Sequence, residues 1–502
     1  MFQESEGSPL HEQMIDTTSF IPILDKNETP YIPTNGWTYY IEAVRSKSWP
    51  ECKYRFLSYT SDEDSKVDMW EAAGTNQRWT IVANSGSSGA VYLKTTYGEY
   101  MSYSDDCENV SIKTSQQAGK NQEFRFIKGD NTQFQYYIQA VGRDSCDKRY
   151  LSFPVGCSTS TPDTLDFWYA AGPDQRFRIF PVQSKDKFEQ SMNAKSPCPD
   201  PYLWWVNSTS GYSLICTGDN LPLFKSNKLT TDVEFLKTGV ALSGDTKPVW
   251  ARSTSRWAPE NYHTQGDHNV IFVSVDQGGG LHRTGYVWSQ SGVGPKMWNK
   301  YSPNYMELSK TAGGEIDSTI FKDPSDGKIY IIWKSDDNRV GSLYTRIWAQ
   351  QIEFDGFSVK ALSDPKVIMD SKGLWWIDSW VEGGTLVEGP EMVKLNGYYY
   401  LFFAAGKFCT GSYTEGVARS KSLWGPYEKM GVPLLSTGMV GYVNQQKIIG
   451  PGHGAFVYDE KSSQWFSVWH GSFASGSSCV RYPFITKLDF SSSDAWPFTR
   501  WD

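Results

Sequence analysis

Short segments rich in aromatic and β-branched residues recur along the chain, separated by turns rich in Gly, Asn, Asp and Pro. Segments of the first kind favour β-strands, and residues of the second kind favour tight turns. Apolar residues spaced three and four positions apart, which would indicate amphipathic helices, are nearly absent. The pattern predicts an all-β protein.

In the last ~300 residues, the strand-like segments form five pairs, each preceded by a similar short sequence. The pairs span 202–217, 261–275, 318–333, 392–403 and 455–469. The landmarks before them are Asp200, Trp257, Asp317, Glu388 and His453, which are 57, 60, 71 and 65 residues apart. A repeat of about 60 residues in four-stranded units is typical of a β-propeller. The first strand of each blade lines the central channel, so these landmarks should converge on one pocket.

A second repeat precedes this region. Segments 73–79, 118–124 and 171–177 share the order Ala-Gly, two residues, Gln, one residue, aromatic, and their Gln residues are 45 and 53 positions apart. Three such copies resemble the ricin-like β-trefoil with its Gln-x-Trp signature. The resemblance implies that the aromatic residue fills the core, that the Gln holds a turn, and that the domain can bind sugars. A trefoil that only packs against its neighbour is the alternative.

The two repeats divide the chain into four predicted regions. Residues 1–35 form a polar arm punctuated by Pro, and residues 36–182 form the trefoil. Residues 183–198 are a linker, and residues 199–502 form the five-bladed propeller. The predicted architecture is therefore an N-terminal β-trefoil followed by a five-bladed β-propeller.

Composition narrows the choice of partners. A net charge of −8 and a pI near 5.5 argue against nucleic acid or an anionic membrane as the main partner. No apolar run approaches the ~18 residues that a membrane-spanning helix needs. Aromatic residues make up 15% of the chain, an excess that suits strands and would also supply stacking surfaces for sugar rings.

The cysteines indicate an oxidising compartment. Eight Cys fall into two groups of four, before residue 160 and after residue 197, which suits disulfides within each domain. The pairing cannot be derived from the sequence, but Cys146–Cys157 and Cys198–Cys216 could each close a hairpin, leaving Cys52–Cys107 and Cys409–Cys479. Sequons at Asn27, Asn109 and Asn207 are compatible with secretion. Because Met1–Ser5 does not begin a signal peptide, either one has been removed or none existed; we expect a secreted protein.

The five landmark segments resemble those of glycoside hydrolase family 43, whose members are five-bladed propellers. The family pattern runs Asp-Pro, Trp-Ala-Pro, Ile-Asp before a Phe and an Asp-x-Asp-Gly turn, Glu-Gly-Pro before Gly-Tyr-Tyr-Tyr-Leu, and Gly-Pro-Gly-His. The matching residues are Asp200-Pro201, Trp257-Ala258-Pro259, Ile316-Asp317 with Phe321 and Ser325-Asp326-Gly327, Glu388-Gly389-Pro390 with Gly397-Tyr398-Tyr399-Tyr400-Leu401, and Gly450-Pro451-Gly452-His453. No single motif is specific, but all five in order at blade spacing form a strong signal.

The chemistry explains why such a site needs several acids. Inverting hydrolysis of a glycosidic bond uses one carboxylate to deprotonate water and one carboxylic acid to protonate the leaving oxygen. The resemblance implies that Asp200 is the general base, Glu388 the general acid, and Asp317 the carboxylate that modulates the pKa of the acid. Glu388 also precedes Gly389-Pro390 and an aromatic strand, a dry setting that favours a neutral carboxyl.

The resemblance adds three residues that bind substrate: Trp257, His453 and Arg481. His453 matches an axial His that in many members contacts a central cation, often calcium, and a buried hydrogen-bonded His is the alternative. No cofactor is expected to be required. Glu260, Glu315 and Glu391 lie one to three residues from family positions and are expected to support the acids rather than react.

The expected function is inverting hydrolysis of cell-wall polysaccharide side chains or ends, of the α-L-arabinofuranosidase or arabinanase type, by a monomer. β-Xylosidase and exo-β-1,3-galactanase are alternatives within the family. A retaining fructan or sucrose hydrolase shares the propeller, but the Asn-Asp-Pro-Asn and Arg-Asp-Pro motifs of that group are missing here. A non-catalytic glycan-binding lectin is the alternative from another class.

Overall fold

The computed structural model describes two compact units, the first comprising Leu24–Phe188 with Phe490–Trp496 and the second Glu189–Asp489 with Pro497–Asp502. The second unit begins inside the predicted linker. The described residues are 38–43, 56–60, 66–70, 75–84, 90–107, 110–113, 118–128, 135–143, 146, 149–153, 163–168, 177–183 and 189–500, the last range without 243–246, 265–267, 290–291, 310, 343, 373, 375–385, 431–432, 475–478 and 491–495.

Every named element in these ranges is a β-strand or a short 3₁₀ helix, so the all-β class is confirmed. Within the described part of the chain, no helix combines the length and apolar character needed to cross a lipid bilayer.

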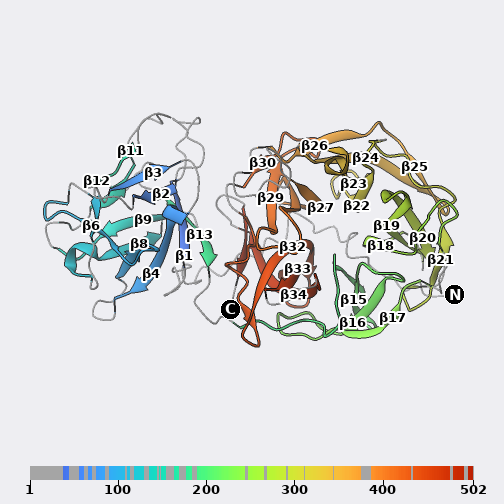
Figure 1. Cartoon of the computed structure of the whole chain (residues 1–502), viewed down its shortest axis with the longest axis horizontal. Coiled ribbons are helices and arrows are strands. Elements are labelled where there is room, and N and C mark those ends of the chain that lie inside the picture. The colour runs from blue at the N-terminus through green and yellow to red at the C-terminus, as the bar shows by residue number, and fades with distance from the viewer. Residues whose placement is uncertain are drawn as a thin grey trace, which may run out of the picture. The chain divides into compact units, whose positions relative to one another are not determined.

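The second unit consists of five antiparallel sheets arranged as the blades of a propeller (Figure 1). Blades 1 and 2 comprise β14 (Tyr202–Asn207), β15 (Gly211–Ile215), β16 (Pro222–Ser226) and β17 (Leu236–Val240), then β18 (Arg256–His263), β19 (Asn269–Gly278), β20 (Leu281–Ser289) and β21 (Trp298–Tyr301). Blade 3 comprises β22 (Glu315–Lys322), β23 (Ile329–Ser335), β24 (Arg346–Asp355), β25 (Ser358–Ala361) and β26 (Lys366–Asp370). Blades 4 and 5 comprise β27 (Val387–Leu395), β28 (Tyr398–Ala405), β29 (Thr414–Ser420) and β30 (Glu428–Lys429), then β31 (Tyr442–Val443), β32 (Gln446–Asp459), β33 (Gln464–Phe473), β34 (Tyr482–Phe490) and β35 (Pro497–Arg500). The predicted five-bladed propeller is confirmed, and each predicted strand pair forms the first two long strands of one blade.

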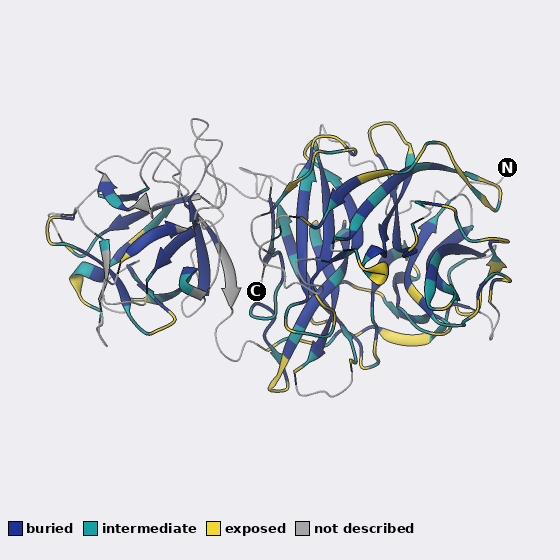
Figure 2. Cartoon of the chain, turned by 45° about the horizontal axis from the view of Figure 1, so that its top comes forward, coloured by how far each residue is buried: buried dark blue, intermediate teal, exposed yellow. Residues whose placement is uncertain are grey.

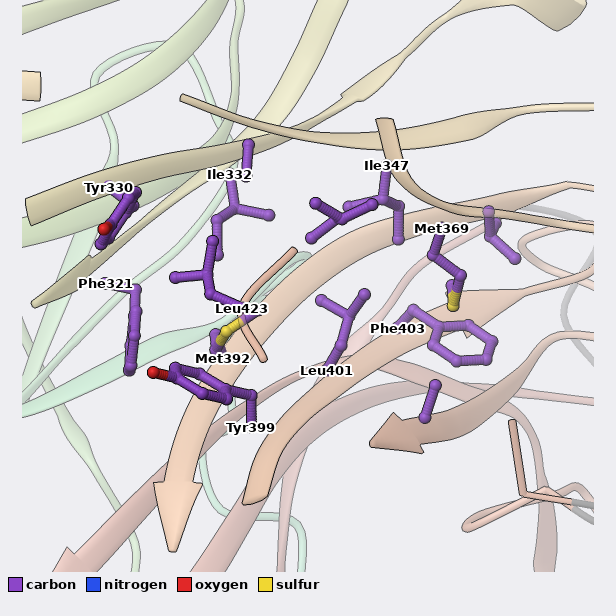
Figure 3. Close-up of a cluster of buried hydrophobic side chains, with 14 of the residues drawn as sticks. Phe321, Tyr330, Ile332, Ile347, Met369, Met392, Tyr399, Leu401, Phe403 and Leu423 are labelled. Carbon is purple, nitrogen blue, oxygen red and sulfur yellow. The ribbon is translucent and has the colours of Figure 1, made fainter. Parts of the chain in front are cut away.

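Hydrophobic side chains join each blade to the next. Between blades 3 and 4, for example, Ile332 and Ile347 pack against Leu401 and Phe403 (Figure 3). Similar clusters join blades 1 and 2, blades 2 and 3, and blades 5 and 1. Burial of these apolar faces is the main favourable contribution to the assembly of the blades.

The segment before β14 also joins the two ends of the ring. Its backbone amides at Gln190, Asn193 and Cys198 donate hydrogen bonds to blade 5 carbonyls at Tyr442, Pro483 and Arg481, with N–O distances of 2.7, 3.0 and 2.9 Å. The predicted disulfides Cys198–Cys216 and Cys409–Cys479 are both confirmed. The three backbone hydrogen bonds thus join the start of blade 1 to blade 5, although about 240 residues of chain separate the two blades.

The first unit is a 13-stranded antiparallel arrangement. Its strands are β1 (Thr38–Ala43), β2 (Phe56–Tyr59), β3 (Val67–Trp70), β4 (Arg78–Ala83), β5 (Val91–Lys94), β6 (Tyr100–Tyr103), β7 (Val110–Lys113), β8 (Phe124–Lys128), β9 (Gln135–Ala140), β10 (Tyr150–Ser152), β11 (Asp163–Thr164), β12 (Asp166–Trp168) and β13 (Phe177–Gln183), with the 3₁₀ helices η1 (Thr75–Gln77) and η2 (Lys120–Gln122). In both units the buried residues lie mainly along the strands and the exposed ones in the connections (Figure 2).

The repeated residues of this unit have equivalent surroundings. Gln77 and Gln122 donate from Nε2 to the hydroxyls of Ser58 and Ser102, at 2.6 and 2.8 Å. The aromatic residues two positions after each repeated Gln are fully buried; they are Trp79, Phe124 and Phe177. Gln175 lies outside the described residues. The repeat thus fills a core and holds turns, as its pattern predicts.

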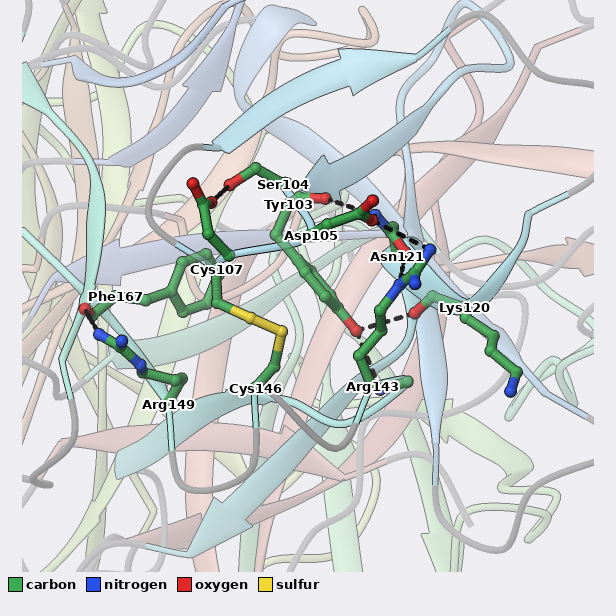
Figure 4. Close-up of a disulfide and its surroundings, with 12 residues drawn as sticks. Tyr103, Ser104, Asp105, Cys107, Lys120, Asn121, Arg143, Cys146, Arg149 and Phe167 are labelled. Carbon is green, nitrogen blue, oxygen red and sulfur yellow. Dashed lines mark hydrogen bonds and ion pairs between the residues drawn. A yellow bond between two sulfur atoms is a disulfide. The ribbon is translucent and has the colours of Figure 1, made fainter.

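One part of the predicted disulfide pairing is wrong. Cys107 is bonded to Cys146 (Figure 4), so neither Cys146–Cys157 nor Cys52–Cys107 can form. The prediction favoured pairs close in sequence, whereas the fold brings the turn after β6 within a Cα–Cα distance of 5.6 Å of the loop after β9. Cys52, Cys157 and the sequons at Asn27 and Asn109 lie outside the described residues, and Asn207 is exposed at the end of β14.

Candidate active site

One residue at or just before the first long strand of each blade has a left-handed backbone conformation. The φ values are 49° at Asp200, 45° at Ala258, 56° at Asp317, 52° at Gly389 and 53° at His453. In blades 2 to 5, the pairing register shifts at this point, as it does at a β-bulge. Left-handed conformations are uncommon for residues other than Gly and cluster at functional sites.

The bulges show that two landmarks are one residue out of step. The structural equivalents of Asp200 and Asp317 are Ala258 and Gly389, so Trp257 and Glu388 each precede the bulge residue of their blade. Successive residues of a strand point to opposite sides, which a bulge changes locally. Trp257 and Glu388 therefore leave the backbone in a different direction from the two Asp residues.

A ring of hydrogen bonds holds the bulges in place. In each blade, a side chain of the preceding blade accepts a hydrogen bond from a backbone amide at or beside the bulge. The pairs are His470 Nδ1 with Asp200 N at 3.1 Å, Thr217 Oγ1 with Ala258 N at 2.7 Å, Ser274 Oγ with Asp317 N at 3.1 Å, Asp317 Oδ2 with Gly389 N at 3.1 Å, and Glu415 Oε2 with Gly454 N at 3.1 Å. These contacts offset part of the strain of the left-handed residues, which costs about 1–3 kcal/mol each.

The five left-handed residues line a single pocket at the propeller axis. Its lining consists of residues 200–202, 258–260, 317–318, 389–391 and 453–455, one segment from each blade. The predicted convergence of the five landmark segments is thus what the fold produces. The pocket brings Asp200 and Asp317 together, and Glu388 adjoins its lining at Gly389.

Asp200 is held as a carboxylate. Arg481 Nη1 donates to its Oδ1 at 2.6 Å, and the hydroxyl of Thr217 donates to its Oδ2 at 2.6 Å. Nδ1 atoms of His453 and His470 lie 3.4 Å from Oδ1. Burial alone would raise the pKa of Asp200, but the Arg481 guanidinium, the two His side chains and Thr217 hold this pKa well below its usual range.

Asp317 has the opposite character. Burial raises its pKa to about 6, and the negative charges of Glu388 and Asp200 add to the rise, while His453 and Lys334 oppose it. Its Oδ2 accepts the amide hydrogen of Gly389. Two carboxyls of one pocket therefore favour different protonation states, which is the condition for separate acid and base roles.

The carboxyl of Glu388 is fixed at both oxygens. Lys334 Nζ lies 3.1 Å from Oε2, and the Tyr413 hydroxyl donates to Oε1 at 2.8 Å. The Lys334 side chain is almost fully buried on β23 and also contacts Asp336 at 3.0 Å. The surroundings of Glu388 are therefore a buried ammonium group and a hydroxyl rather than the purely apolar setting that its flanking sequence indicates.

Comparison with known proteins identifies this arrangement. The profile of Glycosyl hydrolases family 43 matches residues 195–497, which is more than half of the chain. The chain belongs to glycosyl hydrolases family 43. The members of this family are glycosyl hydrolases, as the name of the family states.

Curated relatives of this family 43 enzyme differ in the sugar that their names give. A xylosidase/arabinosidase of Butyrivibrio fibrisolvens is 26% identical over 312 residues, covering 60% of this chain and 54% of the relative. An arabinan endo-1,5-α-L-arabinosidase B of Emericella nidulans is 23% identical over 340 residues, covering 58% of this chain and 81% of the relative. A xylan 1,3-β-xylosidase of a Vibrio species is 30% identical over 157 residues, covering 30% of this chain and 25% of the relative. The chain thus spans about half of the first of these relatives and a quarter of the last.

A solved structure of a thermostable family-43 glycoside hydrolase has the same fold. It superposes with a TM-score of 0.50 at 23% identity, covering 64% of this chain and 96% of the other.

His453 of the family 43 enzyme packs on the bulge of the neighbouring blade. A Cβ added at Gly389 would lie 2.9 Å from the His453 ring, so the close approach requires Gly there in addition to the left-handed φ. Among the described residues, no group of three or more His, Cys, Asp or Glu side chains is placed to hold a metal ion. A cation at His453 stays a prediction.

Trp257 forms an exposed face beside the pocket. Its ring stacks on His282 at a centroid distance of 3.6 Å, and 37% of its surface is exposed. His282 is buried, and its Nδ1 donates a hydrogen bond to the carbonyl of Gly280 at 2.8 Å. His282, whose role the sequence leaves open, therefore supports the ring of Trp257 from behind.

A second group of buried carboxyls, here called the strand set, consists of Glu260, Glu391 and Glu415. Glu260 Oε1 accepts the amide hydrogen of Ile320 at 2.7 Å, and Glu391 Oε2 accepts the hydroxyl of Thr319 at 3.0 Å. Burial raises the pKa of all three, that of Glu391 to about 8. We call Asp200, Asp317 and Glu388 the bulge set.

Several residues that hold the bulge set were not predicted from the sequence. Thr217, Ser274 and His470 bind bulge amides, and Lys334 and Tyr413 bind Glu388. Two of them carry a signal, because Lys334 and His470 are ionisable residues within strongly apolar strands. Glu315, a neighbour of Asp317, instead pairs with Arg283 on β20.

Proposed function

We propose that this family 43 enzyme hydrolyses α-L-arabinofuranosyl linkages of cell-wall polysaccharides with inversion of the anomeric carbon. The observation that carries the mechanism is the electrostatic contrast within one pocket. Asp200 is kept ionised by Arg481, while Asp317, beside Glu388, has a pKa of about 6. An inverting glycosidase needs one ionised and one protonated carboxyl at the scissile bond.

In the proposed reaction, Asp200 takes a proton from a water molecule whose oxygen attacks the anomeric carbon. Glu388 gives a proton to the glycosidic oxygen as the bond to the anomeric carbon breaks. Lys334 and Tyr413 hold the Glu388 carboxyl in place. Burial, with repulsion from Glu388 and Asp200, raises the pKa of Asp317 to about 6, so Asp317 can hold a proton in the same pocket as the Glu388 carboxyl.

The names of the relatives support arabinose as the sugar and offer one competitor. The match to arabinan endo-1,5-α-L-arabinosidase B of Emericella nidulans covers 81% of that protein's length, compared with 54% and 25% for the other two relatives. The Butyrivibrio fibrisolvens and Vibrio relatives, named as xylosidases, support a β-xylosidase as the second candidate.

We further propose that residues 36–182 form a ricin-like β-trefoil that binds glycan. The equivalent surroundings of Gln77 and Gln122 and the burial of Trp79, Phe124 and Phe177 support the repeat. We also propose that the protein is secreted, because three disulfides in the described residues suit an oxidising compartment. We propose that it acts as a monomer.

The test is a panel of aryl α-L-arabinofuranoside, β-D-xyloside and β-D-galactoside with arabinan, xylan and β-1,3-galactan, assayed with intact enzyme and Glu388→Gln. We expect hydrolysis of the arabinosides, release of the inverted anomer by NMR, and loss of polysaccharide hydrolysis in the variant. Preference for the xyloside or galactoside would replace the proposed sugar, and release of the retained anomer would overturn the proposed mechanism. Glycan binding with no hydrolysis of any substrate would favour a lectin.

A further inference from the structure

The loop between β28 and β29, residues 406–413, contacts residues on two sides of the pocket. At its end, Tyr413 binds the carboxyl of Glu388. At its start, the ring of Phe408 lies over the Arg481 guanidinium at 5.5 Å from the ring centroid, and Arg481 binds Asp200. This loop therefore contacts the proposed acid, Glu388, directly. It contacts the proposed base, Asp200, through one intermediate residue, Arg481.

The loop is fixed at several points. Cys409, next to Phe408, forms the disulfide with Cys479, two residues before Arg481. The hydroxyl of Thr410 binds the carbonyl of Lys407 and the hydroxyl of Ser412, both at 2.7 Å. The disulfide thus links the residue after Phe408 to the segment that carries Arg481, so Phe408 is held close to Arg481.

The exposure of Phe408 is what calls for an explanation. In the described part of the propeller, the large aromatic side chains that are classed as exposed are Trp257 at 37%, Phe408 at 41% and Trp424 at 37%. Trp257 adjoins the pocket-lining residue Ala258, and Phe408 lies over an Arg that binds a catalytic carboxylate. Trp424 instead packs with Tyr330 and Lys366 on blade 3. Two of these three aromatic side chains therefore lie beside the same pocket.

We propose that Phe408 forms a sugar-stacking surface at the edge of the active pocket on the Asp200 and Arg481 side, taking a sugar ring of the glycan chain outside the reacting unit. The proposal rests on the proposed function for the position of the reacting sugar. An exposed ring that loses water to a sugar face gains binding energy, and the disulfide reduces the entropy lost when the ring is ordered. Phe408 then complements Trp257, whose ring is supported by His282.

The test compares Phe408→Ala and Phe408→Trp with Trp424→Ala, an exposed aromatic of blade 4 that also packs on a cation but faces Tyr330 and Lys366 of blade 3. Hydrolysis of arabinotetraose, or of xylotetraose if the panel favours xylosides, is measured beside that of the aryl glycoside. For Phe408→Ala we expect a 5- to 20-fold rise in KM for the tetraose, less than a twofold change for the aryl glycoside, and an unchanged pH profile. Phe408→Trp should restore KM, and Trp424→Ala should leave it unchanged.

Three results would overturn the proposal. They are an unchanged KM in Phe408→Ala, a KM change equal to that of Trp424→Ala, and an equal loss on both substrates with a shifted pH profile, which would mean that Phe408 acts only by holding Arg481. Calorimetric titration of Glu388→Gln with the same tetraose separates this proposal from the catalytic one. If the enzyme proves inactive, weaker tetraose binding by Glu388→Gln/Phe408→Ala than by Glu388→Gln still supports the surface, and equal binding rejects it.

The disulfide supplies an independent variant. In Cys409→Ser/Cys479→Ser, the loop loses its covalent link while Phe408 keeps its ring. We expect a two- to fivefold rise in KM for the tetraose, in the same direction as Phe408→Ala. Circular dichroism and thermal unfolding establish that the double variant is folded, and an unchanged KM in a folded protein would show that the link does not position the ring.

Discussion

The carboxyls of the bulge set and the strand set are buried, except that of Glu388, which is partly buried, and the two sets differ in their neighbouring cations. In the bulge set, Arg481 contacts Asp200 and Lys334 contacts Glu388. In the strand set, the contacts of Glu260 and Glu391 are a backbone amide and a hydroxyl. Burial raises the pKa of a carboxyl in both sets, and only in the first does a cation oppose it.

The difference teaches that burial and position on a blade do not make an acid reactive. A carboxyl with a raised pKa and no neighbouring cation stays neutral at moderate pH and acts as a structural hydrogen-bonding group. A carboxyl paired with Arg keeps its charge and can accept a proton from water. The cations therefore separate the two sets.

The largest expected effect comes from removing the base. Asp200→Asn should lower kcat by about 10³-fold or more, because an amide cannot accept the proton of the attacking water. Glu260→Gln is the matched change in the strand set and should alter kcat less than about threefold, since Glu260 is neutral in the fold. Both are measured with the best substrate of the panel. A large loss of kcat in folded Glu260→Gln would mean that the strand set takes part in the chemistry.

The next effect concerns Lys334. Lys334→Met removes the ammonium that holds Glu388 and should lower kcat/KM roughly 10- to 100-fold, the equivalent of a charge-assisted hydrogen bond of ~1.5–3 kcal/mol. Because the same ammonium lowers the pKa of Asp317, its loss raises that pKa, so the alkaline limb expected near pH 6 should move to higher pH.

The measurement is kcat/KM from pH 4 to 9, with thermal unfolding to establish folding. Lys360→Met, which breaks an exposed pair with Glu353, is the control and should change neither quantity. An alkaline limb that stays in place in folded Lys334→Met would remove Lys334 from the proton-holding group.

The sequence predicts the bulge set because the set depends on local motifs at blade spacing. Asp200 and Asp317 line the pocket, Glu388 precedes its lining residue Gly389, and Glu260 and Glu391 line it as well, while the roles assigned to these residues stay predictions. What the sequence did not predict are partners from other strands and loops. Lys334 and Arg481 reach their carboxylates across 54 and 281 positions of chain, and no local pattern encodes such contacts.

Two further misses have local causes. The bulge changes the side of the strand on which a residue lies, so Trp257 and Glu388 stand one residue before the true equivalents of the Asp positions. The pair Cys107–Cys146 joins two turns 39 residues apart, where short hairpin closure favoured Cys146–Cys157. Both errors follow from treating a three-dimensional relation as a spacing along the chain.

A smaller effect should appear in the pH dependence of stability. The folded-state pKa of Glu391 is about 8, above its unfolded value of 4.5, so folded protein binds more protons between these values. Stability is therefore fully present below about pH 4.5 and falls as pH rises towards 8. Glu391→Gln mimics the neutral acid and should reduce the fall by roughly 2–3 kcal/mol between pH 5 and 7, one proton over two pH units. Urea unfolding at several pH values measures this, with the exposed Glu353→Gln as control; parallel curves for Glu391→Gln and wild type would contradict a neutral Glu391.

The smallest expected effect comes from the ring of amide contacts that holds the bulge set. Ser274→Ala removes the hydroxyl that accepts the amide hydrogen of Asp317, at a cost of about 1 kcal/mol of stability. Ser213→Ala is the matched control, because Ser213 is equally buried on β15 and its hydroxyl has no hydrogen-bond partner in the described structure. Ser274→Ala should lower Tm by roughly 2–4 °C and kcat by a few-fold, while Ser213→Ala should change neither. If Ser274→Ala lowers Tm but leaves kcat unchanged, the ring stabilises the propeller without positioning Asp317, and the separation of the two sets then rests on the cations alone.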